Sequence, residues 1–358
     1  MRYLLLALAL IGCTPTQQEI NSSEIDSYIT QAGKLSVAEE QQKTEITCDM
    51  ECLQPEQDGD SLCSYRKFKQ TQRFDQFVAL QPNSATLWPG NVVSGRGASL
   101  GLLTPLGLPL APSTVSISLE GVRGKAGGTL ADPNLFTFRK LRNEILESGV
   151  RGDTPAAIDL QITEVHSLSQ VGVKLGAGVN WPGGGKVAGS FDFTSRDKKT
   201  KVLVDFTQAY YTIDVNAPLR PSSFFLATIR PEDVEKVVSR DNPPVYIQSI
   251  TYGRRVIFAV ESNKSSREIE AAVKAAYNAK AIEGDVSIDV ESKKTLDEST
   301  IRAFILGGSG EDAVGAVAGF EGVIEYIKNG GNYSKDSPGS PIAYKLAYLN
   351  NEITQLAF

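Results

Sequence analysis

The sequence predicts an α+β protein, because long stretches with strand character alternate with separate helical segments. The strand stretches alternate apolar and polar residues, and the helical segments carry recognisable caps and terminators. A third observation is a segment, residues 265–291, that fits a helix by composition and a strand by periodicity. With 358 residues, the chain is long enough for one large or two ordinary domains.

Strands are expected where apolar residues recur at every second position. The expected strands are 114–119, 158–181, 186–216, 245–260, 301–306 and 342–349. Helices are expected where Pro or a polar cap precedes a helical composition and Gly or Asn follows it. The expected helices are 134–148, 231–240 and 320–328.

Residues 265–291 are compatible with two structures. Ser265 and Ser266 are typical helix caps, acidic residues follow in the first turn, and Ala, Glu and Lys dominate the next turns. Yet every odd position from Ile269 to Ala281 is apolar and most even positions are polar, which is the period of a strand with one wet face. The alternation resumes after a turn at 282–284. A segment that fits both a compact helix and an amphipathic hairpin suggests refolding into a membrane.

Residues 171–194 show the same period of two. Apolar residues alternate with Gly, Lys and Asn up to Trp181, a turn follows at 182–185, and the alternation resumes from Val187. Taken alone, this pattern is typical of an ordinary half-buried hairpin in a soluble sheet. Two such patterns flanking one central sheet favour a pair of membrane hairpins instead.

The composition is that of an ordinary globular protein. The net charge of −6 argues against nucleic acid as the main partner. No run reaches the roughly 18 apolar residues of a transmembrane helix, so the chain would have to cross a bilayer as strands.

The N-terminus, residues 1–13, is expected to be an export signal. Arg2 precedes an apolar run, and Leu10 to Cys13 resembles a bacterial lipobox, in which the Cys is lipidated. An ordinary signal peptide that happens to contain Cys13 is the alternative. Lipidation would make the chain an exported bacterial lipoprotein, held at the outer membrane or cell surface or released.

Residues 14–64 are polar and are expected to form a tether or pro-segment, partly disordered. Export implies an oxidising compartment, so Cys48, Cys52 and Cys63 predict one disulfide and one remaining thiol. A metal bound with a fourth ligand from elsewhere is the alternative, but the chain has a single His and no second pair of closely spaced cysteines. The globular part is expected to cover residues 65–358.

No catalytic constellation is recognisable, so the chain is not expected to be an enzyme or to need a cofactor or metal. His166 has no nucleophile partner in its surroundings. Gly183 to Lys186 lacks the Ser or Thr of a phosphate-binding loop.

Five motifs resemble the thiol-activated, cholesterol-dependent cytolysins of the perforin-like superfamily, and they occur in family order. They are Leu87 to Gly90, Ala209 to Val215, Asn242 to Arg254, Phe304 to Gly308 and Pro341 to Leu346. The resemblance implies a bent, twisted antiparallel sheet flanked by two helical clusters. In that family each cluster refolds into a transmembrane β-hairpin of a large barrel.

By position, the two hairpins correspond to about 169–197 and 271–294. The resemblance also implies that Gly253, Gly307 and Gly308 let an edge strand swing away and expose a template for the next subunit. In a barrel, polar positions would face the lumen and apolar positions the lipid. The expected lumen-facing residues are Lys174, Asp192, Glu270, Lys274, Lys280, Asp285 and Asp289. The expected lipid-facing residues are Val173, Leu175, Val179, Trp181, Phe191, Val273, Tyr277, Val286 and Ile288.

Two departures from the family pattern bear on function. The family's C-terminal cholesterol-binding β-sandwich is not found in the sequence, so direct cholesterol recognition is not implied. The aligned subunit-contact positions carry Leu160, Ile162, Ile301 and Ala318, which are not the aromatic and charged types of the family.

The chain resembles the short members of two-component systems that pair with a longer homologue. It is therefore expected to form pores in membrane lipid, in a ring of its own copies or with such a partner. The alternative is a non-lytic lipid-anchored protein acting in binding or scaffolding.

Overall fold

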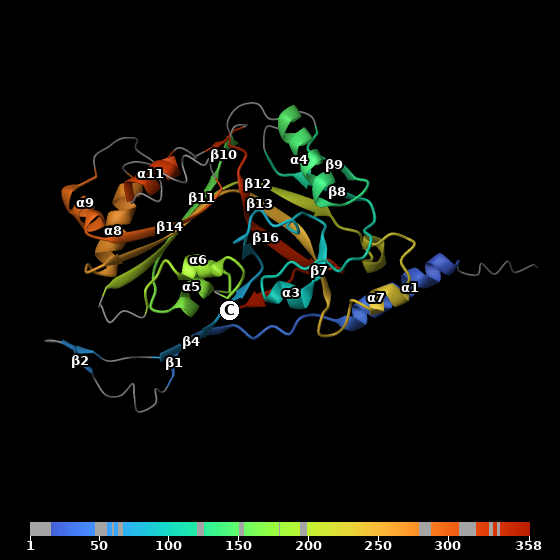
Figure 1. Cartoon of the computed structure of the whole chain (residues 1–358), viewed down its shortest axis with the longest axis horizontal. Coiled ribbons are helices and arrows are strands. Elements are labelled where there is room, and N and C mark those ends of the chain that lie inside the picture. The colour runs from blue at the N-terminus through green and yellow to red at the C-terminus, as the bar shows by residue number, and fades with distance from the viewer. Residues whose placement is uncertain are drawn as a thin grey trace, which may run out of the picture.

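The computed structural model describes residues 16–46, 56–58, 61–63, 67–119, 125–149, 154–178, 180–193, 199–278, 288–307, 320–328, 332–334 and 337–358. Its centre is a large antiparallel sheet organised around two long strands, β12 (Thr200–Asn216) and β13 (Pro244–Ser262) (Figure 1). Helical clusters cover the sheet, so the predicted α+β fold with a flanked antiparallel sheet is confirmed.

The central pair has different neighbours along its length. At one end, β11 (Ala157–Glu164) pairs with β12 and β14 (Thr300–Leu306) pairs with β13, so these two strands form the outer edges of that half of the sheet. The other half adds five shorter strands. They are β6 (Phe77–Val78), β7 (Val92–Ser94), β8 (Ser113–Ile117), β9 (Gly127–Leu130) and β16 (Ser340–Tyr348).

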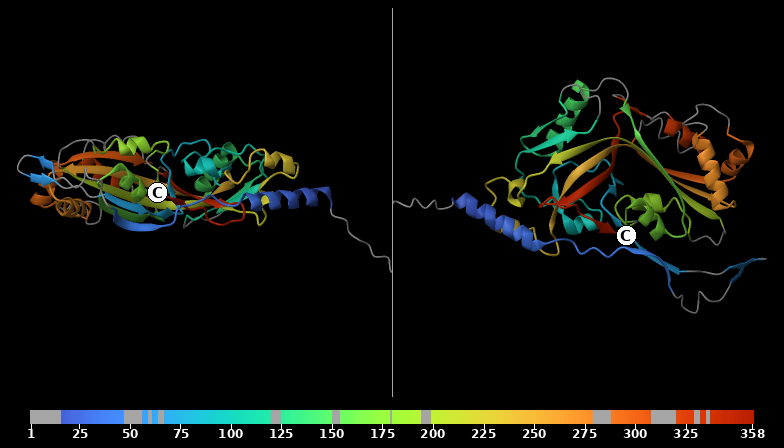
Figure 2. Two further views of the ribbon diagram at one scale, coloured as in Figure 1. Left: turned by 90° about the horizontal axis from the view of Figure 1, so that it is seen from below. Right: turned by 180° about the vertical axis from the view of Figure 1, so that it is seen from behind.

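Alternate residues of the central strands face two separate cores. Leu203 and Ile257 face a core that includes α5 (Leu168–Leu175) and the chain that follows it. Val204 and Phe258 face a core that includes α8 (Ser266–Tyr277), α9 (Val290–Asp297) and α11 (Phe320–Lys328). We call α5 with α6 (Gly184–Ala188) the first cluster and α8 with α9 the second cluster. The edge-on view shows them on opposite faces of the sheet (Figure 2).

Three sequence-based boundaries are wrong. The expected strand 158–181 ends at Glu164, and Ser167 then caps α5 through a hydrogen bond from the Gln170 amide. The expected strand 186–216 starts only at Thr200, because α6 occupies its first residues. The expected helix 231–240 is the single turn α7 (Pro231–Glu235). In the first two cases the alternating segment lies on the sheet in helical form, as the family resemblance implies.

The expected strands at 245–260, 301–306 and 342–349 match β13, β14 and β16 within a few residues. The expected helix 134–148 is α4 (Leu135–Gly149), which packs beside β8 and β9 (Figure 1). Two short elements, α3 (Gly95–Ser99) and the 3₁₀ turn η1 (Pro221–Phe224), complete this half.

Part of the segment expected to be a polar tether is a docked helix. Helix α1 (Gln17–Ala32) starts with a capping box in which the Thr16 side chain accepts from the Glu19 amide and Glu19 accepts from the Thr16 amide. Ile25 and Ile29 are buried, and the Tyr28 hydroxyl donates to the Val238 carbonyl. The Thr-x-x-Glu signal was present in the sequence and was missed.

Four two-stranded pairs lie outside the central sheet among the described residues. β1 (Gln41–Ile46) pairs with β4 (Lys67–Thr71), and all six residues of β1 are exposed. The remaining two-stranded pairs join β2 (Glu56–Asp58) to β3 (Ser61–Cys63), β5 (Arg73–Phe74) to β17 (Leu356–Ala357), and β10 (Thr154–Pro155) to β15 (Asn332–Tyr333). Cys13, Cys48 and Cys52 lie outside the described residues, so lipidation and disulfide pairing stay predictions.

Candidate functional site

The second cluster resolves the ambiguity of residues 265–291 in favour of a helix over 266–277. Ser265 and Glu268 form a reciprocal capping box. The Ser265 hydroxyl and the Ser265 amide both donate to the Glu268 carboxylate and hold its pKa below the ordinary value. The buried positions are Ile269, Ala272, Val273 and Ala276, which follow helical spacing. They pack on Val204, Phe206, Val256 and Phe258 of the central strands.

Alanine allows this segment to fit both periods. Ala272 and Ala276 lie on the polar side of the strand pattern, yet in the helix they face the sheet and are buried. Ala271 lies on the apolar side of the strand pattern and is exposed in the helix. Because alanine is small and nonpolar, it tolerates water on a helix and burial under one. The sequence pattern is therefore a superposition of two amphipathic faces.

The expected lumen-facing residues of the second cluster lie toward solvent. Lys274 donates to Glu270 at 2.6 Å, one turn apart on the outer face of α8. Asp289 caps α9 by accepting from the Ser292 amide. Lys280, Asp285 and Val286 lie outside the described residues.

The first cluster is held by buried aliphatic residues, among them Val171, Leu175 and Val187, and by one aromatic side chain. Trp181, which follows α5, is 7% exposed and packs on Phe77 and Phe358 with ring centroids 6.0 and 5.2 Å apart. Its indole nitrogen donates to the Ser99 carbonyl at 3.3 Å. A Cβ on Gly101 would lie 2.4 Å from the indole, so the indole is seated directly against backbone.

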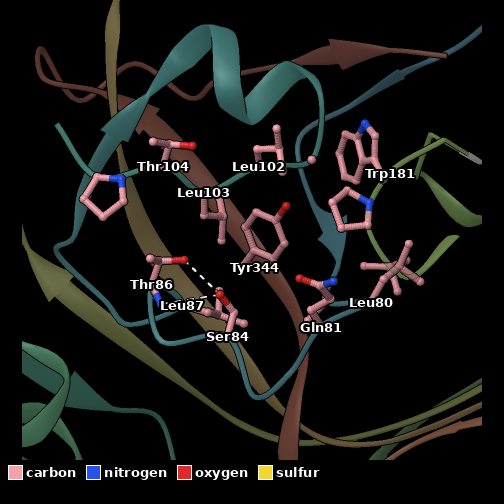
Figure 3. Close-up of a pocket in the computed structure, with 15 residues that line it drawn as sticks. Leu80, Gln81, Ser84, Thr86, Leu87, Leu102, Leu103, Thr104, Trp181 and Tyr344 are labelled. Atoms are coloured by element: carbon pink, nitrogen blue, oxygen red, sulfur yellow. Dashed lines mark hydrogen bonds between the residues drawn. The ribbon is translucent and has the colours of Figure 1, made fainter. Parts of the chain in front are cut away.

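A pocket of about 320 Å³ lies beside Trp181. Figure 3 shows its walls, which come from the loop 78–87, the loop 101–105, Trp181 with Pro182, and Tyr344 of β16. None of these lining residues carries a charge. Burial raises the pKa of the Tyr344 phenol far above its ordinary value, so this hydroxyl remains protonated.

Most of the expected lipid-facing residues are removed from water in this structure. Val173, Leu175, Trp181, Phe191 and Val273 are each less than 9% exposed. Tyr277 and Ile288 are half-buried, and Val179 lies outside the described residues. Among the expected lumen-facing residues, Lys174 and Glu270 are half-buried while Asp192, Lys274 and Asp289 are exposed. Of the described residues, five expected to face lipid are thus buried and three expected to face the lumen are exposed, with two of each group half-buried.

Gly253 lies where two strands meet on one edge of β13. β14 pairs with β13 from Arg255 onward, and β16 pairs with it up to Gly253. A Cβ on Gly253 would lie 2.0 Å from the Gln208 carbonyl oxygen of β12, so only glycine fits this crossing. The pairing of β12 with β13 also has an irregularity at this level, between Ala209 and Tyr211.

Two further glycines, Gly307 and Gly339, lie against Gly253, and we call the three together the three-glycine junction. Gly307 ends β14 and Gly339 precedes β16, with φ values of 81° and 78°. A Cβ on Gly307 would approach the Gly253 oxygen to 2.7 Å, and one on Gly339 would approach the Gly253 nitrogen to 2.8 Å. The structure thus brings Gly253 and Gly307 together, while Gly308 lies outside the described residues. Gly339 was missed, although it precedes an expected strand.

Arg254 is a second residue that the sequence analysis did not single out. It is 1% exposed, its Nη2 donates to the Tyr326 carbonyl of α11 at 2.7 Å, and its guanidinium lies 3.6 Å from the Tyr326 ring centroid. The Tyr326 hydroxyl donates to the Gly307 carbonyl. Nε and Nη1 of Arg254 have no hydrogen-bond acceptor among the described residues. A buried cation therefore ties α11 to the junction.

The aligned subunit-contact positions lie on the two edge strands. Leu160 and Ile162 of β11 and Ile301 of β14 are half-buried and pack against the core under the second cluster. Ala318 lies outside the described residues.

Within the described part of the chain, no three His, Cys, Asp or Glu residues are grouped as metal ligands would be. None of the described helices has the length and apolar character needed to cross a bilayer.

Comparisons with known proteins agree with this architecture. Pneumolysin from Streptococcus pneumoniae is 31% identical over 261 residues, which cover 70% of this chain and 54% of pneumolysin. Listeriolysin O from Listeria monocytogenes is 35% identical over 167 residues, which cover 46% of this chain and 31% of that protein. The chain thus spans about half the length of pneumolysin.

Solved structures show the same fold. A pneumolysin structure superimposes with a TM-score of 0.74 and 24% identity, covering 94% of this chain and 73% of that one. The human-specific toxin intermedilysin gives 0.73 and 22%, covering 95% and 74%. The sequence model of the family described as thiol-activated cytolysin matches residues 39–357. The chain therefore belongs to the thiol-activated cytolysin family.

Proposed function

We propose that this chain is a pore-forming subunit that assembles on a membrane and converts its two helical clusters into transmembrane β-hairpins. The observation that carries the proposal is the shared partition of side chains. Apolar residues that would face lipid in the hairpins are packed on the sheet, and charged residues that would face a water-filled lumen are turned to solvent. The two states thus share their large apolar residues, and alanines occupy the positions at which the two faces differ.

Segment lengths agree with this proposal. As a helix, the thirteen residues Ile269–Ala281 would measure about 20 Å, and as a strand about 43 Å. A tilted strand needs about 9–11 residues to span a bilayer. Both arms of each proposed hairpin reach that length.

Assembly must precede insertion. A lone hairpin in lipid would leave backbone amides and carbonyls unpaired at its edges, at several kcal/mol for each group. Only a closed barrel removes these edges, so the hairpins need neighbours from other subunits. The three-glycine junction lies where β14 ends on the edge of β13. Displacement of β14 would expose that edge of β13 to a strand from a neighbouring subunit.

Dye release from liposomes tests pore formation. The mature chain, with and without proteolytic removal of residues 14–64, is mixed with dye-loaded vesicles of phosphatidylcholine and cholesterol. The assay is run alone and with a longer thiol-activated cytolysin added below its own lytic dose. Release that depends on this chain supports the proposal, and its absence under all these conditions contradicts it.

A disulfide lock tests the conversion itself. Phe206 of β12 and Tyr277 of α8 have ring centroids 5.6 Å apart, so the two elements contact each other there. Cysteines at both positions pin the second cluster to the sheet once mass spectrometry shows that they have formed a disulfide. The oxidised double variant should not release dye, and reduction should restore release. The parent protein given the same reductant is the control for effects on Cys48, Cys52 and Cys63. Undiminished release by the oxidised form would exclude conversion of this cluster.

One observation favours the alternative of a non-lytic surface protein. Leu160, Ile162 and Ile301 replace the residue types through which subunits of the family contact each other. Pore formation is compatible with these replacements if the chain assembles with a partner whose edge strands are complementary. A lipid at Cys13 would hold the chain at a membrane whether or not it forms pores. Co-sedimentation with liposomes in the absence of dye release would favour binding or scaffolding.

A further inference from the structure

One buried carboxylate connects the first cluster to the edge strand β14. Glu261 of β13 is 7% exposed, and its Oε1 accepts from the Asp192 amide at 2.9 Å. Its Oε2 lies 3.5 Å from Nη1 of Arg302 on β14. The same Nη1 donates to the Ser190 carbonyl at 3.0 Å. Three elements that are far apart in sequence thus meet at one ion pair.

The contacts are arranged around a single apolar anchor. Phe191 is 6% exposed and packs in the core on this face of the sheet. The carbonyl before Phe191 and the amide after it are the groups that Arg302 and Glu261 bind. Residues 190–192 belong to no strand or helix, so these side chains take the place of a ladder partner for the backbone.

We propose that Glu261 and Arg302 form a latch that makes release of residues 190–192 depend on displacement of β14. The latch rests on the proposed function, because it assigns an order to the conversion of the first cluster. Arg302 stands on β14, opposite Ala259, so it leaves when β14 leaves β13. The Ser190 carbonyl then loses its donor, and Glu261 becomes a buried carboxylate without its cation.

The physical consequence is a cooperative release. A buried charge that loses its partner is strongly unfavourable, so Glu261 would be driven toward water once Arg302 departs. This movement withdraws the acceptor from the Asp192 amide. The Ser190 carbonyl and the Asp192 amide then lose the two side-chain partners that Arg302 and Glu261 provide.

Hydrogen exchange of the soluble protein tests the latch without a membrane. Ala303→Pro loosens β14 beside the latch while keeping the Glu261 and Arg302 side chains, because proline is unfavourable inside a strand and restrains the residue before it. We expect amide exchange at residues 190–192 to rise at least about tenfold in this variant. The matched control is Gln161→Pro on the opposite edge strand β11, which should leave 190–192 protected.

Two direct variants complete the test. Glu261→Gln keeps a side-chain oxygen for the Asp192 amide but removes the charge, and Arg302→Gln removes the donor to Ser190. Each should raise exchange at 190–192, and Ala303→Pro combined with Arg302→Gln should exchange no faster there than either alone. Lys293→Gln, which removes an exposed cation 4.0 Å from Glu321, is the control for a general charge effect.

The outcomes separate the latch from a simple strand anchor. If β14 exchanges faster in Ala303→Pro while 190–192 stay protected, the coupling does not exist. If Arg302→Gln does not fold, Ala303→Pro and Glu261→Gln still decide the question. Exchange in solution and dye release are independent readouts, so failure of the latch is distinguishable from failure of the pore proposal.

Discussion

The two helical clusters lie on the same sheet but are held there differently. The second cluster contains the twelve-residue helix α8, whose apolar face packs on β12 and β13 over several turns. The first cluster contains helices of eight and five residues, which bury Val171, Leu175 and Val187, and the chain beside them adds Trp181 and Phe191. One cluster is held by the continuous apolar face of a single helix, and the other by short apolar contacts from two helices and the chain that joins and follows them.

Local composition explains the difference. Residues 266–277 are rich in Ala, Glu and Lys, which are good helix formers, so α8 agrees with its own propensity. Residues 172–185 contain six glycines among fourteen residues, which weakens any helix or strand there. The first cluster therefore depends on tertiary contacts for its form. We expect single substitutions at its anchors to release it as a unit, whereas α8 should respond gradually along its length.

The largest effect should come from Trp181→Ala. Truncation of a buried Trp in a packed site costs about 3–5 kcal/mol in the free energy of unfolding. Because Trp181 anchors the first cluster, protease cleavage and amide exchange should rise across 171–188 while α8 stays protected. Trp181→Phe, which keeps an aromatic ring, is the matched control. An equal rise of protease cleavage and amide exchange in both clusters would contradict the view that Trp181 anchors the first cluster alone.

Ile269→Ala probes the second cluster. Ile269 is fully buried at the start of α8, so the change removes part of the contact between this helix and the sheet. We expect a loss of about 2–4 kcal/mol in the free energy of unfolding, measured by urea denaturation. The exposed Ala271→Ser should change it little. A loss of amide protection in the first cluster as large as that in α8 would contradict the separate packing of the two clusters.

Gly253→Ala tests the junction on which both clusters depend. A Cβ at this position would lie 2.0 Å from the Gln208 carbonyl, so the backbone must shift, at a cost of about 1–3 kcal/mol. Gly185→Ala is the matched control, since nothing lies within 4 Å of a Cβ there. Unfolding of the two variants by urea should differ in midpoint. Equal midpoints would mean that the junction accommodates a side chain.

The smallest effect should be a pH dependence at the start of α8. The pKa of Glu268 is lowered by its hydrogen bonds to Ser265, so the charged carboxylate stabilises the capped helix. This contribution is fully present above the ordinary pKa of the carboxyl and is lost as pH falls through the lowered value. Amide exchange at 266–269 should therefore rise in acid relative to the intrinsic rate, and Glu268→Gln should remove the dependence. A Glu268→Gln profile identical to the parent would contradict this role.

Much of the sheet was predictable because its strands satisfy local rules. β13, β14 and β16 alternate or run apolar between clear turn signals, and α4 carries both a start and a stop signal. The first cluster was misassigned as two long strands because its period of two is real. The capping box of α1 was overlooked in a polar stretch. Arg254, Gly339 and the Glu261–Arg302 pair could not be found, because each acquires its role from segments distant in sequence.

The sequence by itself determined that residues 171–194 and 269–291 can form amphipathic strands, since period-two alternation is a local property. It also determined the cap of α8, because Ser265 and Glu268 are three residues apart. Only the tertiary structure decided which form these segments take here. β12 and β13 offer the second cluster an apolar face that buries Ile269 and Val273, and Trp181 of the first cluster packs on Phe77 and Phe358. Under the proposed conversion, the choice between helix and strand depends on whether the sheet or lipid covers the apolar side chains.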